Sequence, residues 1–93
     1  MTVATLRLEL RVGDCPSLRE RRRRLGRIAA KLRRYFNVSV AEDDRIGTPT
    51  QGALVAAAVG NSRVAARDVL ERVADAVAAH PQVELLAQAL HEV

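Results

Sequence analysis

Apolar and polar residues alternate near the start of the chain, where residues 3–12 read VATLRLELRV. One side of this segment is apolar throughout, being made of Ala4, Leu6, Leu8, Leu10 and Val12. A period of two over ten residues is typical of a half-buried strand. Gly13, Asp14 and Pro16 interrupt the alternation, so the strand is expected to end before them.

The period becomes helical after Ser17. Ser17 is followed three residues later by Glu20, a capping-box pattern that predicts a helix starting at Leu18. At about 100° per residue the apolar side chains fall within one stripe about 100° wide. The stripe consists of Leu18, Leu25, Ile28, Ala29, Leu32 and Phe36. We therefore expect a helix over 18–35 that packs against a sheet.

Two strands and a loop are predicted next. Residues 37–42, NVSVAE, alternate and predict a second strand, and the polar segment 43–50 with Gly47 and Pro49 predicts a loop. Residues 51–59, QGALVAAAV, are almost continuously apolar. Such a run is expected of an interior strand with both faces covered or nearly so.

A second helix and a last strand complete the pattern, and no internal repeat is visible. Asn61 or Ser62 can cap a helix over 63–79, and Pro81 follows its end. Its expected buried side consists of Val69, Leu70, Val73, Ala76 and Val77. Residues 83–92 also fit a helix, but their start after a proline and the need for a sheet partner favour a strand.

The order strand, helix, strand, strand, helix, strand predicts one domain over 1–93 with a ferredoxin-like βαββαβ sandwich. In this α+β fold a four-stranded antiparallel sheet carries both helices on one face. The first and third strands would be central. The other face of the sheet would then show Arg7, Glu9, Arg11, Leu54, Ala56 and Ala58. This mixed face is compatible with a homodimer and equally with a solvated surface.

Charge is distributed unevenly along the chain. The net charge is only +4, from 15 basic and 11 acidic residues. Nine of the basic residues and a single acid lie between Pro16 and Phe36, so the rest of the chain is net negative. This asymmetry favours an anionic partner. Nearly all the basic residues are arginines, whose planar fork suits phosphate, although an alanine-rich chain suggests a general compositional bias as well.

Several classes of chemistry have no support in the sequence. A single cysteine, Cys15, excludes an internal disulfide and indicates a reducing cytoplasm. No segment has the leader or membrane-span pattern, so a soluble, unprocessed protein without membrane contact is expected. His80 and His91 are isolated, and Asp43 and Asp44 fit a turn better than a metal site. We expect no catalytic residue, metal or cofactor.

The outer surface of the predicted first helix is the candidate nucleic-acid site. It would be formed by Arg19, Arg22, Arg23, Arg27, Lys31, Arg33 and Arg34. Binding would use phosphate contacts and shape, because the predicted central strands lack the aromatic residues with which an RNA-recognition motif stacks bases. The ordinary alternative is a solvated helix face.

Four residues near this surface have separate expectations. Arg21 projects into the apolar stripe, so it either reaches water at the rim or pairs with an acid such as Glu42. Arg24 lies beside the stripe and is expected to pack its stem and extend its head into water. Phe36 is expected in the core and Tyr35 at its rim.

Residues 17–42 resemble the YlxP proteins, a small bacterial family catalogued as a domain of unknown function. The matching blocks are SLRERR, residues 17–22, and FNVSVAE, residues 36–42, with the family's spacing between them. The resemblance implies a ferredoxin-like fold and, from the family's gene context, a link to ribosomal RNA. The loop DDRIGTPTQG departs from the family pattern, in which a histidine and a tryptophan are frequent, so any contact made by that loop would differ here.

Two functional hypotheses follow. The first is a non-enzymatic, cytoplasmic, RNA- or ribosome-associated accessory protein that binds the phosphate backbone through its basic first helix. The alternative is a protein-interaction or homodimerisation module with no role in nucleic-acid binding.

Overall fold

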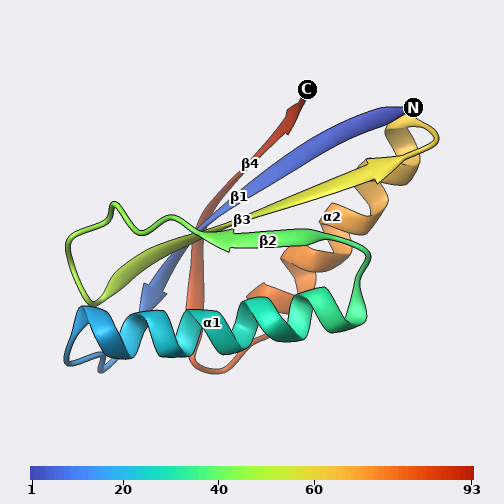
Figure 1. The fold of residues 1–93 in the computed structure, drawn as a ribbon. Helices are drawn as coiled ribbons and strands as arrows, with labels where there is room; N and C mark the ends of the chain where they lie inside the picture. Colours follow the sequence, from blue (N-terminus) through green and yellow to red (C-terminus); the bar gives the residue numbers. More distant parts are fainter.

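The computed structural model describes residues 1–93 and has the six elements expected from the sequence (Figure 1). They are β1 (Thr2–Val12), α1 (Leu18–Tyr35), β2 (Ser39–Glu42), β3 (Gln51–Gly60), α2 (Arg63–Ala78) and β4 (Val83–Glu92). β2 begins two residues later than predicted, because the chain turns sharply out of α1 and the Val38 N–H bonds to the Phe36 carbonyl. The last segment is a strand, since it pairs with β1 along its length.

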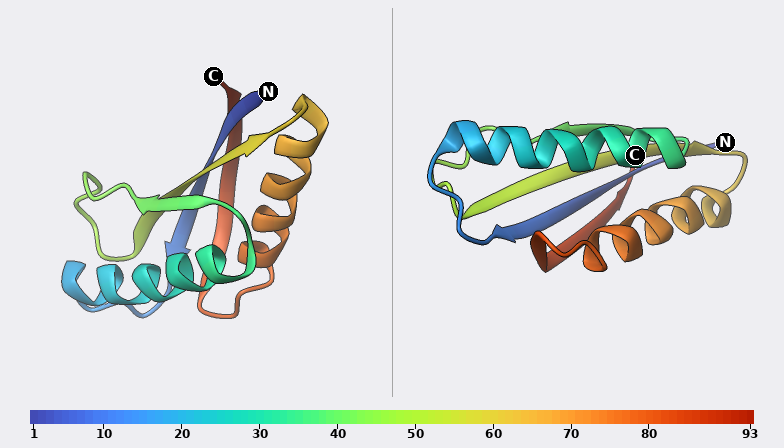
Figure 2. Two further views of the ribbon diagram at one scale, coloured as in Figure 1. Left: turned by 45° about the vertical axis from the view of Figure 1, so that its right-hand side comes forward. Right: turned by 90° about the horizontal axis from the view of Figure 1, so that it is seen from below.

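The strands form one antiparallel sheet in the order β2-β3-β1-β4, so the first and third strands are central as predicted. Both helices cover the same face of this sheet (Figure 2). The predicted ferredoxin-like α+β fold is therefore confirmed. The pairing of β1 with β4 shifts register between Glu9 and Leu10.

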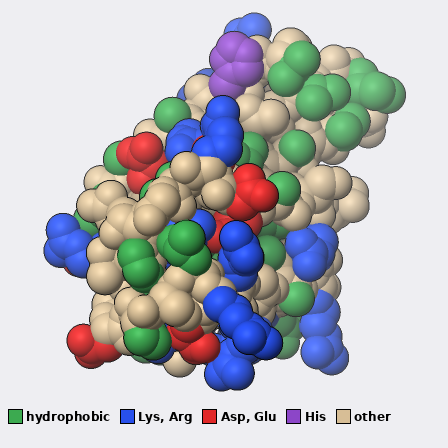
Figure 3. Space-filling view, turned by 60° about the vertical axis from the view of Figure 1, so that its left-hand side comes forward, with side chains coloured by type: hydrophobic (Ala, Val, Ile, Leu, Met, Phe, Trp, Pro, Cys, Tyr) green, Lys and Arg blue, Asp and Glu red, His purple; other side chains and the backbone are tan.

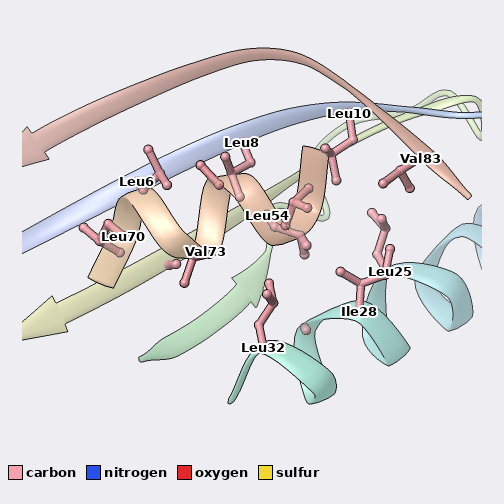
Figure 4. Packing of buried hydrophobic residues seen from close by; sticks show 14 of the residues in the cluster. Leu6, Leu8, Leu10, Leu25, Ile28, Leu32, Leu54, Leu70, Val73 and Val83 are labelled. Carbon is pink, nitrogen blue, oxygen red and sulfur yellow. The ribbon is translucent and has the colours of Figure 1, made fainter. Parts of the chain in front are cut away.

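The hydrophobic core fills the space between the sheet and the two helices (Figure 4). Each helix contributes one stripe of side chains to the core, and five residues of each stripe are buried. In α1 these are Arg21, Leu25, Ile28, Ala29 and Leu32; in α2 they are Ala66, Leu70, Val73, Ala74 and Val77.

The predicted buried side of α2 was partly wrong. Ala76 is exposed and Val69 is only half-buried, whereas Ala66 and Ala74 are buried instead. Alanines occur all round this helix, so the sequence pattern could not fix the direction of its narrow apolar stripe. The way α2 packs against β1 and β3 determines which of its residues face the sheet.

The predicted open face of the sheet was also wrong in its β3 residues. Leu8 lies directly opposite Leu54, and Leu6 opposite Ala56, so these β3 side chains share the core face with β1. The open face instead carries the alternate positions Ala53, Val55, Ala57 and Val59. A continuously apolar strand has no period from which its inward face can be read, and only the register with β1 supplies it. On this face Ala53 is buried, Val55 and Ala57 are half-buried and only Val59 is exposed, so the expectation of two covered or nearly covered faces holds for most of β3 and fails at its end.

Both helices begin with a serine cap. The Ser17 hydroxyl accepts from the Glu20 N–H at 3.0 Å, and the Ser62 hydroxyl accepts from the Ala65 N–H at 3.1 Å. The reciprocal half of the predicted capping box in α1 does not form, because the Glu20 carboxylate pairs with Arg23 and Arg24 instead.

The two helices run in clearly different directions over the sheet (Figure 2). Their backbones approach each other closely at very few points, so most of their packing is against the strands. Neither helix is both long enough and apolar enough to cross a membrane.

Candidate nucleic-acid interface

The residues predicted for nucleic-acid binding all lie exposed on α1, away from its buried stripe. These are Arg19, Arg22, Arg23, Arg27, Lys31, Arg33 and Arg34. Figure 3 shows blue side chains gathered along the lower right of the molecule, at the level of α1 in Figure 1. The structure therefore brings the predicted residues together on one helix surface, which we call the cationic face.

Most of the cationic face has no acidic partner. Only Arg23 pairs with a carboxylate, at 3.5 Å between its Nε and Glu20 Oε2, and the arginine side chain is still 68% exposed. No ion pair is formed by Arg19, Arg22, Arg27, Lys31, Arg33 or Arg34. Neighbouring cations on a helix lie within the Debye length of about 8 Å at physiological salt, so they repel one another. A bound polyanion would relieve this repulsion.

Arg33 has a structural contact in addition to its place on the cationic face. Its Nη1 donates a 3.0 Å hydrogen bond to the carbonyl of Val40 in β2. β2 is an edge strand, and a bond to an unpaired edge carbonyl protects that edge from pairing with another chain. Of the predicted site residues, Arg33 is thus the one that also holds the fold.

The head of Arg24 meets water only in part, with 21% of the side chain exposed, because its guanidinium also has definite partners. Its Nη1 donates to the Gly13 carbonyl at 2.8 Å, its Nη2 to the Asp14 carbonyl at 3.2 Å, and its Nε pairs with Glu20. The turn between β1 and α1 brings these carbonyls beside the helix, which the sequence pattern does not show. Arg24 therefore fastens this turn to α1.

Arg21 is completely buried and pairs with Glu42, one of the two outcomes expected for it. Its Nε lies 3.1 Å from Glu42 Oε2. Its Nη1 donates to the carbonyls of Ile46, Thr48 and Gln51 at 2.7, 2.8 and 3.1 Å. Its Nη2 is buried without a partner. Arg21 thus ties the 43–50 loop and the end of β2 to α1, and it belongs to the interior and not to the cationic face.

Gly52 makes room for this arginine. A Cβ at position 52 would lie 2.7 Å from Leu25 Cδ1 and 3.3 Å from Arg21 Cδ. Any side chain there would push the stem of Arg21 and the tip of Leu25 away from β3. The first residues of β3 and the first turns of α1 are therefore fitted to each other.

The same loop is held on the open face of the sheet by Asp43. The carboxylate of Asp43 accepts from Arg45 and from Arg7, each at 2.8 Å, and also from the Arg45 N–H. Hydrogen bonding by Arg45, and then by Arg7, holds the pKa of Asp43 well below its ordinary 3.8. Asp43 thus serves a turn, as predicted, and no group of three or more His, Cys, Asp and Glu side chains is placed to hold a metal.

A groove between the C-terminal halves of the two helices was not predicted. It has a volume of about 340 Å³ and is lined by Ile28, Lys31, Leu32, Tyr35, Phe36, Ala76, Val77 and His80. Tyr35 is 68% exposed at the rim of the groove. Phe36, expected in the core, is half-buried and packs against the core without being fully buried in it. The only trace of the groove in the sequence is Ala76, whose side chain is small at the point where α2 lines the groove.

The structure also places the single cysteine and one of the two histidines. Cys15 is buried in the core, with its Sγ 3.4 Å from the Ser17 carbonyl. His80 lines the groove, and burial together with the nearby charge of Lys31 lowers its pKa below 6.5. Its Nδ1 accepts from the Gln82 N–H, so the ring proton of the neutral form is on Nε2.

Comparison with known proteins identifies a family without assigning an activity. The model of the family described as "Protein of unknown function (DUF503)" matches residues 3–89. No curated protein matches the chain.

Proposed function

This chain belongs to the DUF503 family of proteins of unknown function, and we propose that it is a non-enzymatic, RNA-associated accessory protein. Its cationic face on α1 binds the phosphate backbone. The observation that carries the proposal is the exposure of seven basic side chains on one helix, six of them without a carboxylate partner.

The geometry of the cationic face suits a polyanion. The 18 residues of α1 extend over about 27 Å, and the arginines along it can each donate two parallel hydrogen bonds to a phosphate. The helix is fixed by its buried stripe, so its cations are held in place before binding. Contacts of this kind are independent of base sequence and weaken steeply as salt rises.

The resemblance to the YlxP proteins supports a ribosomal RNA target in the cytoplasm. Its two blocks, residues 17–22 and 36–42, are far apart in the sequence but contact each other through the ion pair of Arg21 with Glu42. The two blocks thus specify one structural unit, which presents the cationic face. We therefore propose a YlxP-like protein that associates with ribosomal particles.

The proposal is tested with two triple variants that remove the same charge from the two helices. Arg23→Gln, Arg27→Gln and Arg34→Gln alter α1, whereas Arg63→Gln, Arg67→Gln and Arg72→Gln alter α2. Each set contains one arginine with a carboxylate partner and two without. Affinity for a structured ribosomal RNA fragment is measured across a salt series.

The α1 variant should bind at least tenfold more weakly, and the slope of log affinity against log salt should fall by about 0.9 for each phosphate that is no longer neutralised. The α2 variant should bind like the wild type. Equal weakening by both sets would reduce the effect to net charge, and unchanged binding by the α1 set would refute the proposal.

The open face of the sheet favours a second candidate function, a homodimer. Val3 and Val59 lie directly opposite each other there, and they are 38% and 59% exposed. Sedimentation at low and high protein concentration tests this function, and a monomer at every concentration would rule it out.

A further inference from the structure

The groove between the helices adjoins the cationic face. Lys31 and Tyr35 line the groove and also line a shallow basin on the outer surface of α1, whose other residues are Arg27, Ala30 and Arg34. An apolar recess and a row of cations are therefore separated only by the side chains of Lys31 and Tyr35. A ligand that fills both must combine a flat or apolar group with a nearby negative charge.

From this juxtaposition we infer that the groove takes an unpaired base of the bound RNA, while its adjoining phosphates lie on Arg27, Lys31 and Arg34. The inference rests on the proposed function and adds a site that distinguishes unpaired from paired RNA. It goes beyond the expectation from the sequence, in which binding uses phosphates and shape, by adding one base contact.

The dimensions and the lining of the groove suit such an occupant. A volume of about 340 Å³ lies within the range of about 300–1,000 Å³ of small-molecule sites. Its floor is apolar, from Ile28, Leu32 and Val77, and its rim carries the ring of Tyr35. Unstacked bases in RNA are commonly held by stacking on aromatic side chains.

His80 gives the groove a polar group that can read a base edge. The ring is neutral near pH 7 because its pKa lies below 6.5. Its Nδ1 is engaged by the Gln82 N–H, so the neutral ring keeps one donor, Nε2–H. A base has acceptors for such a donor, whereas a lipid acyl chain has none.

Tyr35 supplies a direct readout. The chain has one tyrosine and no tryptophan, so its tyrosine fluorescence reports on the rim of the groove alone. The probes are two RNA hairpins that differ only by one unpaired purine in the stem. The wild type should bind the bulged hairpin about tenfold more tightly, in line with the stacking contribution of one base, and only this hairpin should quench Tyr35.

Variants of Tyr35 distinguish the contribution of the base contact to affinity from that of the phosphate contacts. Tyr35→Ala should bind both hairpins with the wild-type affinity for the paired one, and Tyr35→Phe should keep the preference for the bulge. Val64→Ala is the matched control, because Val64 is 67% exposed in α2 and does not line the groove. Circular dichroism confirms that each variant is folded.

The outcomes distinguish this inference from the proposed function. Equal binding of the two hairpins with no quenching overturns the base site, while a loss of affinity in the triple α1 variant would still uphold phosphate binding. Absence of binding to either hairpin overturns both. Tyr35-dependent binding to phosphatidylglycerol vesicles, with no preference for the bulge, would assign the groove to a lipid and overturn the inference.

Discussion

The two helices of this protein are built alike on their inner sides and differently on their outer sides. Each starts after a serine cap, and the five buried positions of α1 have the same spacing as the five of α2. Leu25 corresponds to Leu70, and Ala29 to Ala74. The chain thus contains a structural repeat, although none was visible in the sequence, because the repeat is confined to the few positions that contact the sheet.

The outer sides differ in charge. α1 carries nine basic residues and one acid, whereas α2 carries three of each. Packing on the sheet requires only the inner stripe, so the outer residues of each helix are free to vary without loss of the fold. The contrast teaches that the cationic face is not a requirement of this architecture, since α2 occupies the same sheet face without one.

The helices also differ at one inner position. Arg21 in α1 corresponds to Ala66 in α2, and each lies against a glycine of β3. Beside Gly52 the arginine enters the interior to reach Glu42 and the loop carbonyls. Beside Gly60 a Cβ would lie only 2.7 Å from the Ala66 backbone nitrogen, so α2 approaches the strand too closely for a long side chain.

The largest effect is expected from Arg21→Met. Loss of the guanidinium leaves the Glu42 carboxylate, two loop carbonyls and the Gln51 carbonyl of β3 without their donor, which should lower the free energy of unfolding by about 3–5 kcal/mol. Urea unfolding of the variant and the wild type measures this loss of stability. Arg27→Met removes the same charge from an exposed site and should change stability by no more than about 0.5 kcal/mol. Similar losses in the two variants would contradict a special role for the buried arginine.

Substitution of the two glycines should show how closely each helix fits the sheet. Gly60→Ala places a methyl group against backbone and should cost about 1–3 kcal/mol of stability, the usual range for overpacking. Gly52→Ala meets the ends of the Leu25 and Arg21 side chains, which can shift, so its cost should be lower. Thermal unfolding of both variants compares them, and the reverse order would be inconsistent with the closer approach of α2.

The serine caps should contribute equally, because their hydrogen bonds are equivalent. Ser17→Ala and Ser62→Ala should each lower stability by about 1 kcal/mol. Denaturant titration of the two variants and the wild type tests this. A much smaller loss for Ser17→Ala would mean that the charges around the start of α1 replace its cap.

The smallest effect concerns His80, which lines the groove between the helices. The pKa of His80 after α2 should be below 6.5 by NMR titration, and Lys31→Gln should raise it because a nearby positive charge is lost. Burial, the larger cause, is unchanged in that variant. Arg72→Gln, on the exposed side of α2, should leave the titration as it is.

The lowered pKa of His80 determines how stability depends on pH. A histidine whose folded pKa is lowered binds a proton more readily when unfolded. Its contribution to stability is complete above pH 6.5 and is lost progressively as the pH falls below that value. His80→Gln should therefore flatten the dependence of the unfolding midpoint on pH below 6.5.

Much of the fold was predictable from the sequence. The bounds of α1 follow from period, caps and breakers, because each signal is local to a few neighbouring residues. The pattern of β4 also fits a helix, so its prediction as a strand depended in addition on the need for a sheet partner. The inward side of β3 and that of α2 were not predictable. QGALVAAAV is apolar at nearly every position, and α2 has alanines all round, so neither segment has a period that selects one face.

The candidate site also has a part that the sequence predicted and a part that it did not. The cationic face was predictable, since helical period alone places Arg23, Arg27 and Arg34 opposite the apolar stripe. The actual partners of Arg24 and the groove were not, because they depend on a turn and on a helix far away in the sequence.

The amino-acid sequence by itself determined the order of the elements, their caps and the concentration of charge on one helix, since these depend on residues a few positions apart. Tertiary structure alone decided which side of β3 and of α2 is buried, because strand register and helix packing set those faces. It also decided between the two outcomes open to Arg21, since burial between α1, β3 and the 43–50 loop leaves that side chain no water. The groove beside the cationic face is likewise set by tertiary structure, because it is lined by the C-terminal halves of two helices that run in different directions over the sheet.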